Sequence, residues 1–221
     1  REEVGNDFAI SIKMNSADFQ KGGFSPEDSI QVAKLFSDSG IDNIEISGGT
    51  YEQPRLLGLD KVSINPKRSE NRKESTIARE AYFLSYAEEI AKVVNIPLMV
   101  TGGFRTKEGM EAALRDGACE IVGVGRPLCA NPYAIKELLS GQIDELPKYE
   151  KTLSIGPWWL SPTSPFRLIQ AINAFSAQAW FYQQIKKMGK GLMPDLNLKP
   201  WKAFREDAKA DQEAIKEYQN F

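Results

Sequence analysis

The sequence predicts an α/β fold: four strand–helix units followed by a helical C-terminal region. Within residues 1–141, four short apolar runs alternate with segments that have helical periodicity. Strands this short and apolar are typical of a parallel sheet covered on both faces. After Gly141 no strand-like run occurs. We therefore predict two parts, residues 1–141 and residues 142–221.

The first unit has the clearest local signals. Residues 8–15 alternate and are rich in β-branched side chains, which predicts a strand. Ser25-Pro26-Glu27-Asp28 supplies an N-cap, a proline at the first helical position and acids in the first turn, and Gly40 ends the helix. The second unit comprises a strand at residues 41–46, an unusually long polar connection at residues 50–75 and a helix at residues 78–94.

The remaining elements follow from the same signals. The predicted strands are residues 97–101 and 120–124, and the predicted helices are residues 106–116, 132–139, 166–187 and 200–218. We expect the tryptophans to pack the C-terminal region onto the strand–helix part, with a subunit interface as the alternative; these are Trp158, Trp159, Trp180 and Trp201. The charged stretch 202–217 predicts a solvated helix face.

Glycines follow the third and fourth strands, in Thr101-Gly102-Gly103-Phe104 and Gly123-Val124-Gly125-Arg126. Glycine lets backbone N–H groups approach an anion, and an arginine adds charge, so these segments predict a phosphate cradle. The alternative is ordinary turn chemistry. In (β/α)8 barrels the phosphate site lies in the loops after the last two strands. The four units therefore predict the second half of such a TIM barrel, with a C-terminal helical extension.

Composition excludes several classes of function. The formal net charge is −2 and the basic residues are scattered, which gives no reason to expect nucleic acid or an anionic membrane surface. No apolar run reaches the roughly 20 residues of a membrane span. Cys119 and Cys129 have no nearby metal-ligand partners, so we expect free thiols, no metal site and a cytoplasmic location. Histidine, the commonest acid–base residue, is absent.

Six ordered blocks resemble the flavin-dependent old yellow enzyme family, also called NADH:flavin oxidoreductases. The resemblance covers roughly residues 10–139, and the C-terminal helices resemble the tail of the NADH-oxidase-like branch. The blocks are residues 13–19 (KMNSADF), 22–25 (GGFS), 45–52 (EISGGTYE), 79–83 (REAYF), 99–105 (MVTGGFR) and 123–128 (GVGRPL).

The resemblance implies a bound FMN that accepts a hydride from NADH or NADPH and passes it to an electron-poor alkene or another acceptor. It implies that Lys13 lies beside the flavin N1 and O2 edge, where a cation stabilises the negative charge of the reduced ring. Many relatives have arginine there, and lysine lacks its planar fork. A structural ion pair of Lys13 with Glu45 or Asp18 is the alternative.

The resemblance also implies a grip on the FMN phosphate. The matching residues are Gly102, Gly103, Gly125 and Arg126, with Phe104 and Arg105 on the same rim. For Arg105 a surface charge beside the next helix is the favoured alternative. Tyr51 is a candidate substrate contact, with loop packing as the alternative.

The family's substrate-activating histidine pair or histidine–asparagine pair, and its proton-donating tyrosine, belong to the first half of the barrel. This chain opens with Arg1 and contains no histidine. We therefore expect the C-terminal part of a longer enzyme with a small-molecule substrate, without catalytic residues of its own and inactive in isolation. Its expected partner is the missing N-terminal half or a second copy.

Two other functions remain open at this point. One is a phosphate-binding TIM-barrel isomerase or lyase that acts on a phosphorylated sugar or indole intermediate, with Glu45 and Asp18 as its acid–base candidates. The other is a non-catalytic half-barrel interaction module, because four units leave two open sheet edges that a stable protein must cover or pair.

Overall fold

The computed structural model describes residues 1–18, 22–48 and 83–219. These residues form two compact units: residues 1–18, 22–48, 83–125 and 138–146 make up the first, and residues 126–137 and 147–219 the second. The predicted connection at residues 50–75, with Tyr51, lies outside the described residues. The boundary after residue 141 stays a prediction, and the structure groups residues 126–137 with the C-terminal helices.

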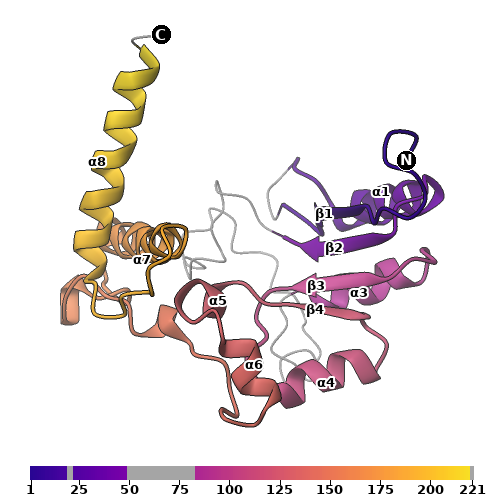
Figure 1. Cartoon of the computed structure of the whole chain (residues 1–221), viewed down its shortest axis with the longest axis horizontal. Helices are drawn as coiled ribbons and strands as arrows, with labels where there is room; N and C mark the ends of the chain where they lie inside the picture. The colour runs from indigo at the N-terminus through magenta and orange to yellow at the C-terminus, as the bar shows by residue number, and fades with distance from the viewer. Residues whose placement is uncertain (19–21, 49–82, 220–221) are drawn as a thin grey trace. The chain divides into compact units, whose positions relative to one another are not determined.

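The first unit is built on a parallel four-stranded sheet in the order β1-β2-β3-β4 (Figure 1). The strands are β1 (Ser11–Asn15), β2 (Asn43–Ser47), β3 (Leu98–Thr101) and β4 (Ile121–Gly123). Lys13 is paired with Glu45, Glu45 with Met99 and Met99 with Ile121, so these four residues form one row across the sheet. The predicted α/β class and parallel strands are confirmed.

Two helices of the first unit begin where the sequence predicts them, whereas the helix predicted from residue 78 begins at Leu84. Helix α1 (Pro26–Asp38) starts with a capping box in which Ser25 Oγ accepts a hydrogen bond from Asp28 N at 3.1 Å, and Asp28 Oδ2 accepts one from Ser25 N at 3.0 Å. Helix α4 (Lys107–Arg115) starts with Thr106 Oγ1, which accepts from Gly109 N at 3.1 Å. Helix α3 (Leu84–Ala91) completes the set in this unit.

The two faces of the sheet differ in chemistry. Ile44, Ile46 and Val100 are fully buried on the face that packs against the helices. On the other face Ser11 Oγ donates to Asn43 Oδ1 at 2.7 Å, and Lys13 Nζ lies 2.6 Å from Glu45 Oε1. Side chains alternate along a strand, so this second face is polar along β1 and β2, while Met99 of β3 and Ile121 of β4 are apolar residues on it. The expectation of strands apolar on both faces is therefore wrong for β1 and β2.

The second unit is helical among its described residues. Its elements are α5 (Arg126–Ala130), the short turns η3 (Tyr149–Lys151) and η4 (Trp158–Leu160), α7 (Arg167–Met188) and α8 (Pro200–Gln219); α6 (Ala134–Leu139) crosses the boundary between the units. Trp180 anchors the core of the unit at 1 % exposure, and its Nε1 donates to Leu198 O at 2.9 Å. No helix within the described ranges is long and apolar enough to cross a membrane.

Two features of this unit differ from the sequence prediction. Helix α5 was not predicted, because Gly125-Arg126-Pro127 resembles a loop, yet proline fits the first turn of a helix. Of the four tryptophans only Trp180 is buried. Trp158, Trp159 and Trp201 are 89 %, 60 % and 48 % exposed, and Trp180 packs within its own unit, so packing of the tryptophans onto the strand–helix part stays a prediction.

Candidate functional site

The turn after β3 requires glycine. Gly102 and Gly103 have φ angles of 132° and 91°, a region that side-chain-bearing residues rarely adopt. They follow Val100 and Thr101 directly, so the buried strand fixes their position at the carboxyl end of the sheet. In open parallel sheets this is the end where ligands bind. The turn therefore presents backbone without side chains where a parallel sheet would bind an anion.

Gly123, the last residue of β4, and Gly125, two residues later, have different roles. A Cβ on Gly123 would lie 1.8 Å from Thr101 Oγ1 and 2.8 Å from Met99 Cε, so Gly123 is needed for β3 and β4 to approach each other. A Cβ on Gly125 would meet no heavy atom within 4 Å. Gly123 has a packing role, whereas a side chain at position 125 would meet only open space.

Lys13 is ion-paired on the polar face of the sheet. Its ammonium lies 2.6 Å from Glu45 Oε1; the Lys13 side chain is 55 % exposed and that of Glu45 is 19 % exposed. Burial of Glu45 acts to raise its pKa, but the hydrogen bond from Lys13 and the charge of Lys13 outweigh burial, so the pKa of Glu45 is lowered. Glu45 is therefore ionised at neutral pH and is no proton donor there.

Asp18, the other predicted partner of Lys13, is engaged locally. Its carboxylate accepts hydrogen bonds from Phe24 N at 3.0 Å and from Asn15 Nδ2 at 3.1 Å. These contacts fix the turn after β1. Of the two partners considered for Lys13, the structure selects Glu45.

Phe104 and Arg105 are both buried. Phe104 is 1 % exposed and belongs to the hydrophobic core, so its side chain is not available to a ligand. Arg105 is 9 % exposed and its Nη1 donates to Phe104 O at 2.7 Å. The prediction of a surface charge at Arg105 is wrong, because Leu146 N donates to Arg105 O at 2.7 Å and brings residues 138–146 against this segment.

Arg126 lies in the second unit at the start of α5. There it lines a cavity of about 90 Å³ together with Glu150, Gln170 and Asn173. Ligand pockets usually measure roughly 300–1,000 Å³, so this cavity is the size of a few water molecules and not of a flavin. The structure thus places Gly102, Gly103 and Gly125 in the first unit and Arg126 in the second.

The described residues offer neither a metal centre nor an activated thiol. No group of three acidic or cysteine side chains is arranged to hold a metal ion in this part of the chain. Cys119 is buried and unpaired, and burial together with the negative charge of Glu120 raises its pKa to about 11. Burial also raises the pKa of Cys129. These thiols are protonated at neutral pH and therefore poor nucleophiles.

Several known proteins are similar to this chain in sequence or in fold. No protein-family profile matches the chain. An "NADH-dependent flavin oxidoreductase iliE" of Hypocrea jecorina is 39 % identical over 144 residues, which cover 63 % of this chain and 33 % of that protein. An "NADH oxidase" of Thermoanaerobacter brockii is 31 % identical over 188 residues, 85 % of this chain and 26 % of that protein.

A solved 2-naphthoyl-CoA reductase complex matches 66 % of this chain and 20 % of its own, with a TM-score of 0.51 and 24 % identity, a likeness of fold alone. The chain spans about a third of the length of the Hypocrea jecorina protein and about a quarter of the length of the Thermoanaerobacter brockii protein. Its parallel sheet and glycine turn define an α/β protein with a candidate anion site. Together with the curated relatives, this places the chain in the NADH:flavin oxidoreductase, or old yellow enzyme, family.

Proposed function

We propose that this chain is the FMN-holding C-terminal half of a (β/α)8-barrel oxidoreductase, with residues 142–221 as its helical extension. The observation that carries the proposal is Gly102-Gly103, two consecutive glycines with positive φ directly after β3, in a chain whose relatives include an NADH-dependent flavin oxidoreductase and an NADH oxidase. When bound, FMN supplies the chemistry of taking a hydride from NADH or NADPH and passing it to an electron-poor alkene or another acceptor.

In this proposal the chain's own residues bind FMN and orient it. Backbone N–H groups of Gly102, Gly103 and Gly125 donate to the phosphate oxygens, and Arg126, the next residue in the chain, adds a charge-assisted contact. Lys13 places an ammonium at the flavin N1 and O2 edge. The pair with Glu45 holds Lys13 in place, because its 2.6 Å contact restricts an otherwise flexible side chain.

The polar face of the sheet supports the half-barrel part of the proposal. In a closed barrel the helices lie outside, and the inner faces of all eight strands together enclose the interior. Here the helices pack on one face, and Ile121 on the opposite face is 42 % exposed. The rest of a longer protein would supply the remaining strands and the groups that activate a small-molecule substrate, so we expect this chain alone to reduce no enone.

A comparison of FMN with riboflavin tests the phosphate grip. The chain is titrated with each flavin and quenching of flavin fluorescence is measured. We expect FMN to bind at least tenfold more tightly, a difference of about 1.4 kcal/mol, because riboflavin lacks the phosphate. Gly125→Ala, whose added methyl group meets only open space in the structure, should weaken FMN and leave riboflavin unchanged.

Equal affinities for the two flavins, or a Gly125→Ala variant that weakens both equally, would remove the basis for the grip. Binding of a phosphorylated sugar without binding of either flavin would favour the isomerase or lyase function instead.

A further inference from the structure

Helix α8 leaves the rest of its unit after two turns. Ala203 is fully buried, and Asp207 Oδ1 accepts a hydrogen bond from Lys186 Nζ on α7 at 2.6 Å. Residues 208–218 are exposed throughout, and the ribbon of α8 extends well beyond α7 in Figure 1. Helix α8 has 20 residues and is about 30 Å long. Without tertiary contacts, a helical stretch as short as its distal half is only marginally stable in water. We therefore expect the distal half of α8 to be stabilised by packing against a partner.

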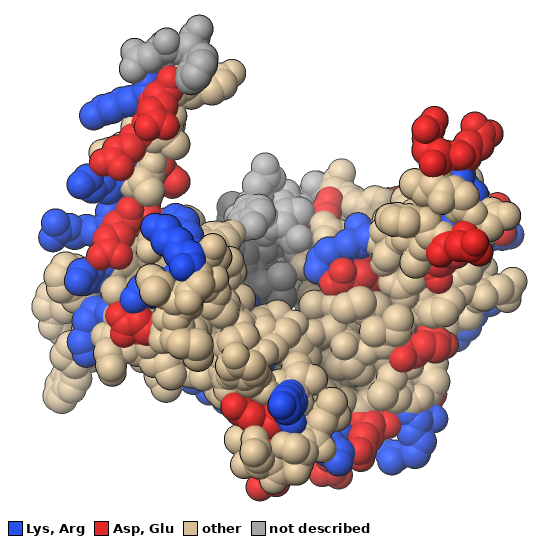
Figure 2. Space-filling view, viewed as in Figure 1, with Lys and Arg blue, Asp and Glu red and all other residues tan. Residues whose placement is uncertain are grey.

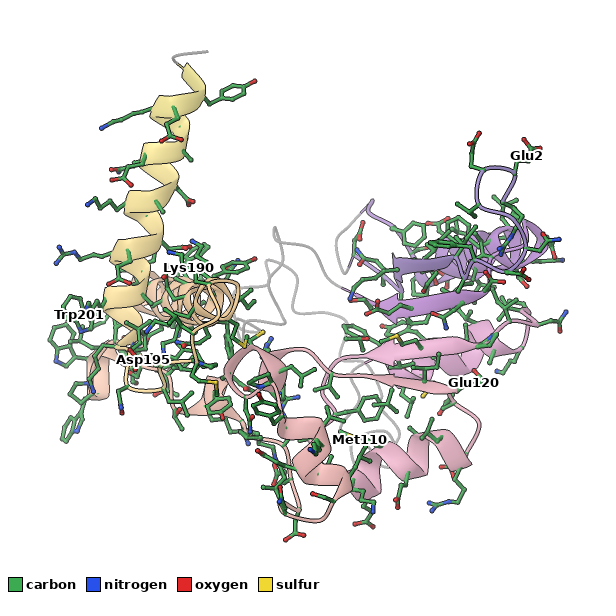
Figure 3. All side chains as sticks on the ribbon, viewed as in Figure 1. Glu2, Met110, Glu120, Lys190, Asp195 and Trp201 are labelled. Carbon is green, nitrogen blue, oxygen red and sulfur yellow. The ribbon has the colours of Figure 1, made fainter. Side chains whose placement is uncertain are left out.

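An apolar stripe runs along the exposed side of α8. Its members recur with the three- and four-residue spacing of coiled-coil seams; they are Trp201, Phe204, Ala208, Asp211, Ile215 and Tyr218. The four large apolar side chains in the stripe are 48 %, 38 %, 57 % and 83 % exposed, in chain order, and Trp201 stands at the base of the helix (Figure 3). The predicted solvated face is thus exposed but not uniformly polar.

Charge is distributed unevenly along α8. Residues 200–209 carry Lys202, Arg205 and Lys209 and two acids, Glu206 and Asp207. Asp207 is paired with Lys186 of α7, and along α8 Lys202 lies 4.0 Å from Glu206 and Lys209 lies 3.7 Å from Glu213. Residues 210–219 carry a single lysine and three acids, Asp211, Glu213 and Glu217. Charged side chains cover much of the visible helix in Figure 2. The helix is therefore net positive near its start and net negative near its end.

This uneven charge distribution favours one binding partner for the exposed side of α8. We propose that α8 is a self-association surface that pairs antiparallel with α8 of a second copy of the chain. A two-fold axis near the middle of the helix puts each positive half against the negative half of the partner subunit, whereas parallel pairing puts like charges together. The seam then matches Trp201 with Tyr218 of the partner subunit, and Phe204 with Ile215 of the partner subunit.

The pairing is weak and reversible. The stripe is under three heptads long, and Asp211 occupies a seam position where a polar residue fixes register at a cost in stability. The antiparallel register brings Asp211 opposite Ala208 of the partner subunit, the smallest side chain in the stripe, which leaves room for the carboxylate. Dimer formation consequently depends on protein concentration and on salt.

Two single-cysteine variants, Phe204→Cys and Ile215→Cys, test the register. Each is oxidised alone and in an equimolar mixture, with the wild type as background for its own thiols. The antiparallel register separates equal positions by eleven residues, about 16 Å along the axis, and a disulfide needs Cα atoms within about 7 Å. We expect a cross-linked dimer in the mixture and none above background from either variant alone. Self-cross-linking of either variant, or no cross-link in the mixture, overturns the register.

Charge reversal tests the pairing without removing a stripe residue. One variant carries Lys202→Glu and Lys209→Glu, the other Glu213→Lys and Glu217→Lys, and each is studied by sedimentation equilibrium with circular dichroism as a check on helix content. We expect the wild type to self-associate, each variant to do so at least tenfold more weakly, and the mixture of variants to recover. Lys34→Glu with Lys107→Glu changes the net charge equally in the first unit and should not affect association.

A wild-type chain that stays monomeric at every concentration, or reversal variants that associate as the wild type does, overturns the proposal. A mixture that fails to recover does the same.

Discussion

Gly123→Ala is expected to be strongly destabilising although it adds only a methyl group. The new Cβ would lie 1.8 Å from Thr101 Oγ1 and 2.8 Å from Thr101 Cβ. Rotation of the Thr101 side chain can move Oγ1 but not Cβ, which the backbone fixes. Strands β3 and β4 must therefore separate at their paired ends, where Thr101 lies opposite Gly123. Overpacking of this kind costs roughly 1–3 kcal/mol, and the immovable Cβ puts this case near about 3 kcal/mol.

Urea unfolding followed by circular dichroism measures the effect, and Gly125→Ala two residues away is the matched control. No heavy atom lies within 4 Å of its added Cβ, so we expect a change between zero and about 1 kcal/mol of stabilisation from the less flexible unfolded chain. The same pair separates the two roles, because Gly125→Ala is the variant expected to weaken FMN binding.

A second substitution identifies the clash as the cause. Thr101→Gly removes both Oγ1 and Cβ, so in the Gly123→Ala background it should restore part of the loss, with a coupling free energy of at least about 1 kcal/mol. Strict additivity of the two substitutions, or a Gly123→Ala chain within about 0.5 kcal/mol of the wild type, would refute the reasoning.

Three further predictions concern other parts of the chain. Because the folded-state pKa of Glu45 lies below its ordinary value of 4.5, its contribution to stability is complete above that pH and is lost as the pH falls through the lowered pKa. Glu45→Gln should therefore flatten the acid side of a stability–pH profile measured by urea unfolding between about pH 6 and pH 3. Cys119, with its pKa raised to about 11, should not react with Ellman's reagent at about pH 8 until denaturant is added. Asn173 donates to Leu160 O and Ile169 O, both at 2.8 Å, and accepts from Ile155 N at 3.0 Å, so Asn173→Ala should cost about 2–3 kcal/mol in thermal or urea unfolding. Half-buried Gln178, whose hydrogen bond to Tyr182 Oη is 3.5 Å long, is the control, and Gln178→Ala should cost less than about 1 kcal/mol.

Local signals predicted the elements that local physics determines. The capping box at Ser25 and Asp28 was readable because both halves of the motif lie within four residues, and the structure contains both hydrogen bonds. The parallel strands were readable because each apolar run was separated from the next by a helix-length segment. Gly102 and Gly103 could be placed at a strand end, although the sequence did not show that both need positive φ.

Features that depend on distant contacts were missed. Arg105 is buried because Leu146, forty-one residues later, hydrogen-bonds its backbone, and no local pattern indicates this contact. Gly123 could not be separated from Gly125 by sequence, because the close approach to Thr101 arises only from the pairing of β3 with β4. The exposure of Trp158 was not predicted, because tryptophan side chains are usually at least partly buried.

The polar face of the sheet connects the fold with the proposed function. Its hydrogen-bonded cross-strand pairs, Ser11 with Asn43 and Lys13 with Glu45, satisfy one another without a covering layer. Such a face is stable against water and also compatible with a polar barrel interior, because the polar groups of these two pairs bond to each other in both states. Closure of a barrel would then depend on hydrogen bonding at the edge strands β1 and β4 more than on apolar burial over Lys13 and Glu45. A longer protein could therefore complete the barrel and leave this ion pair in place beside the flavin.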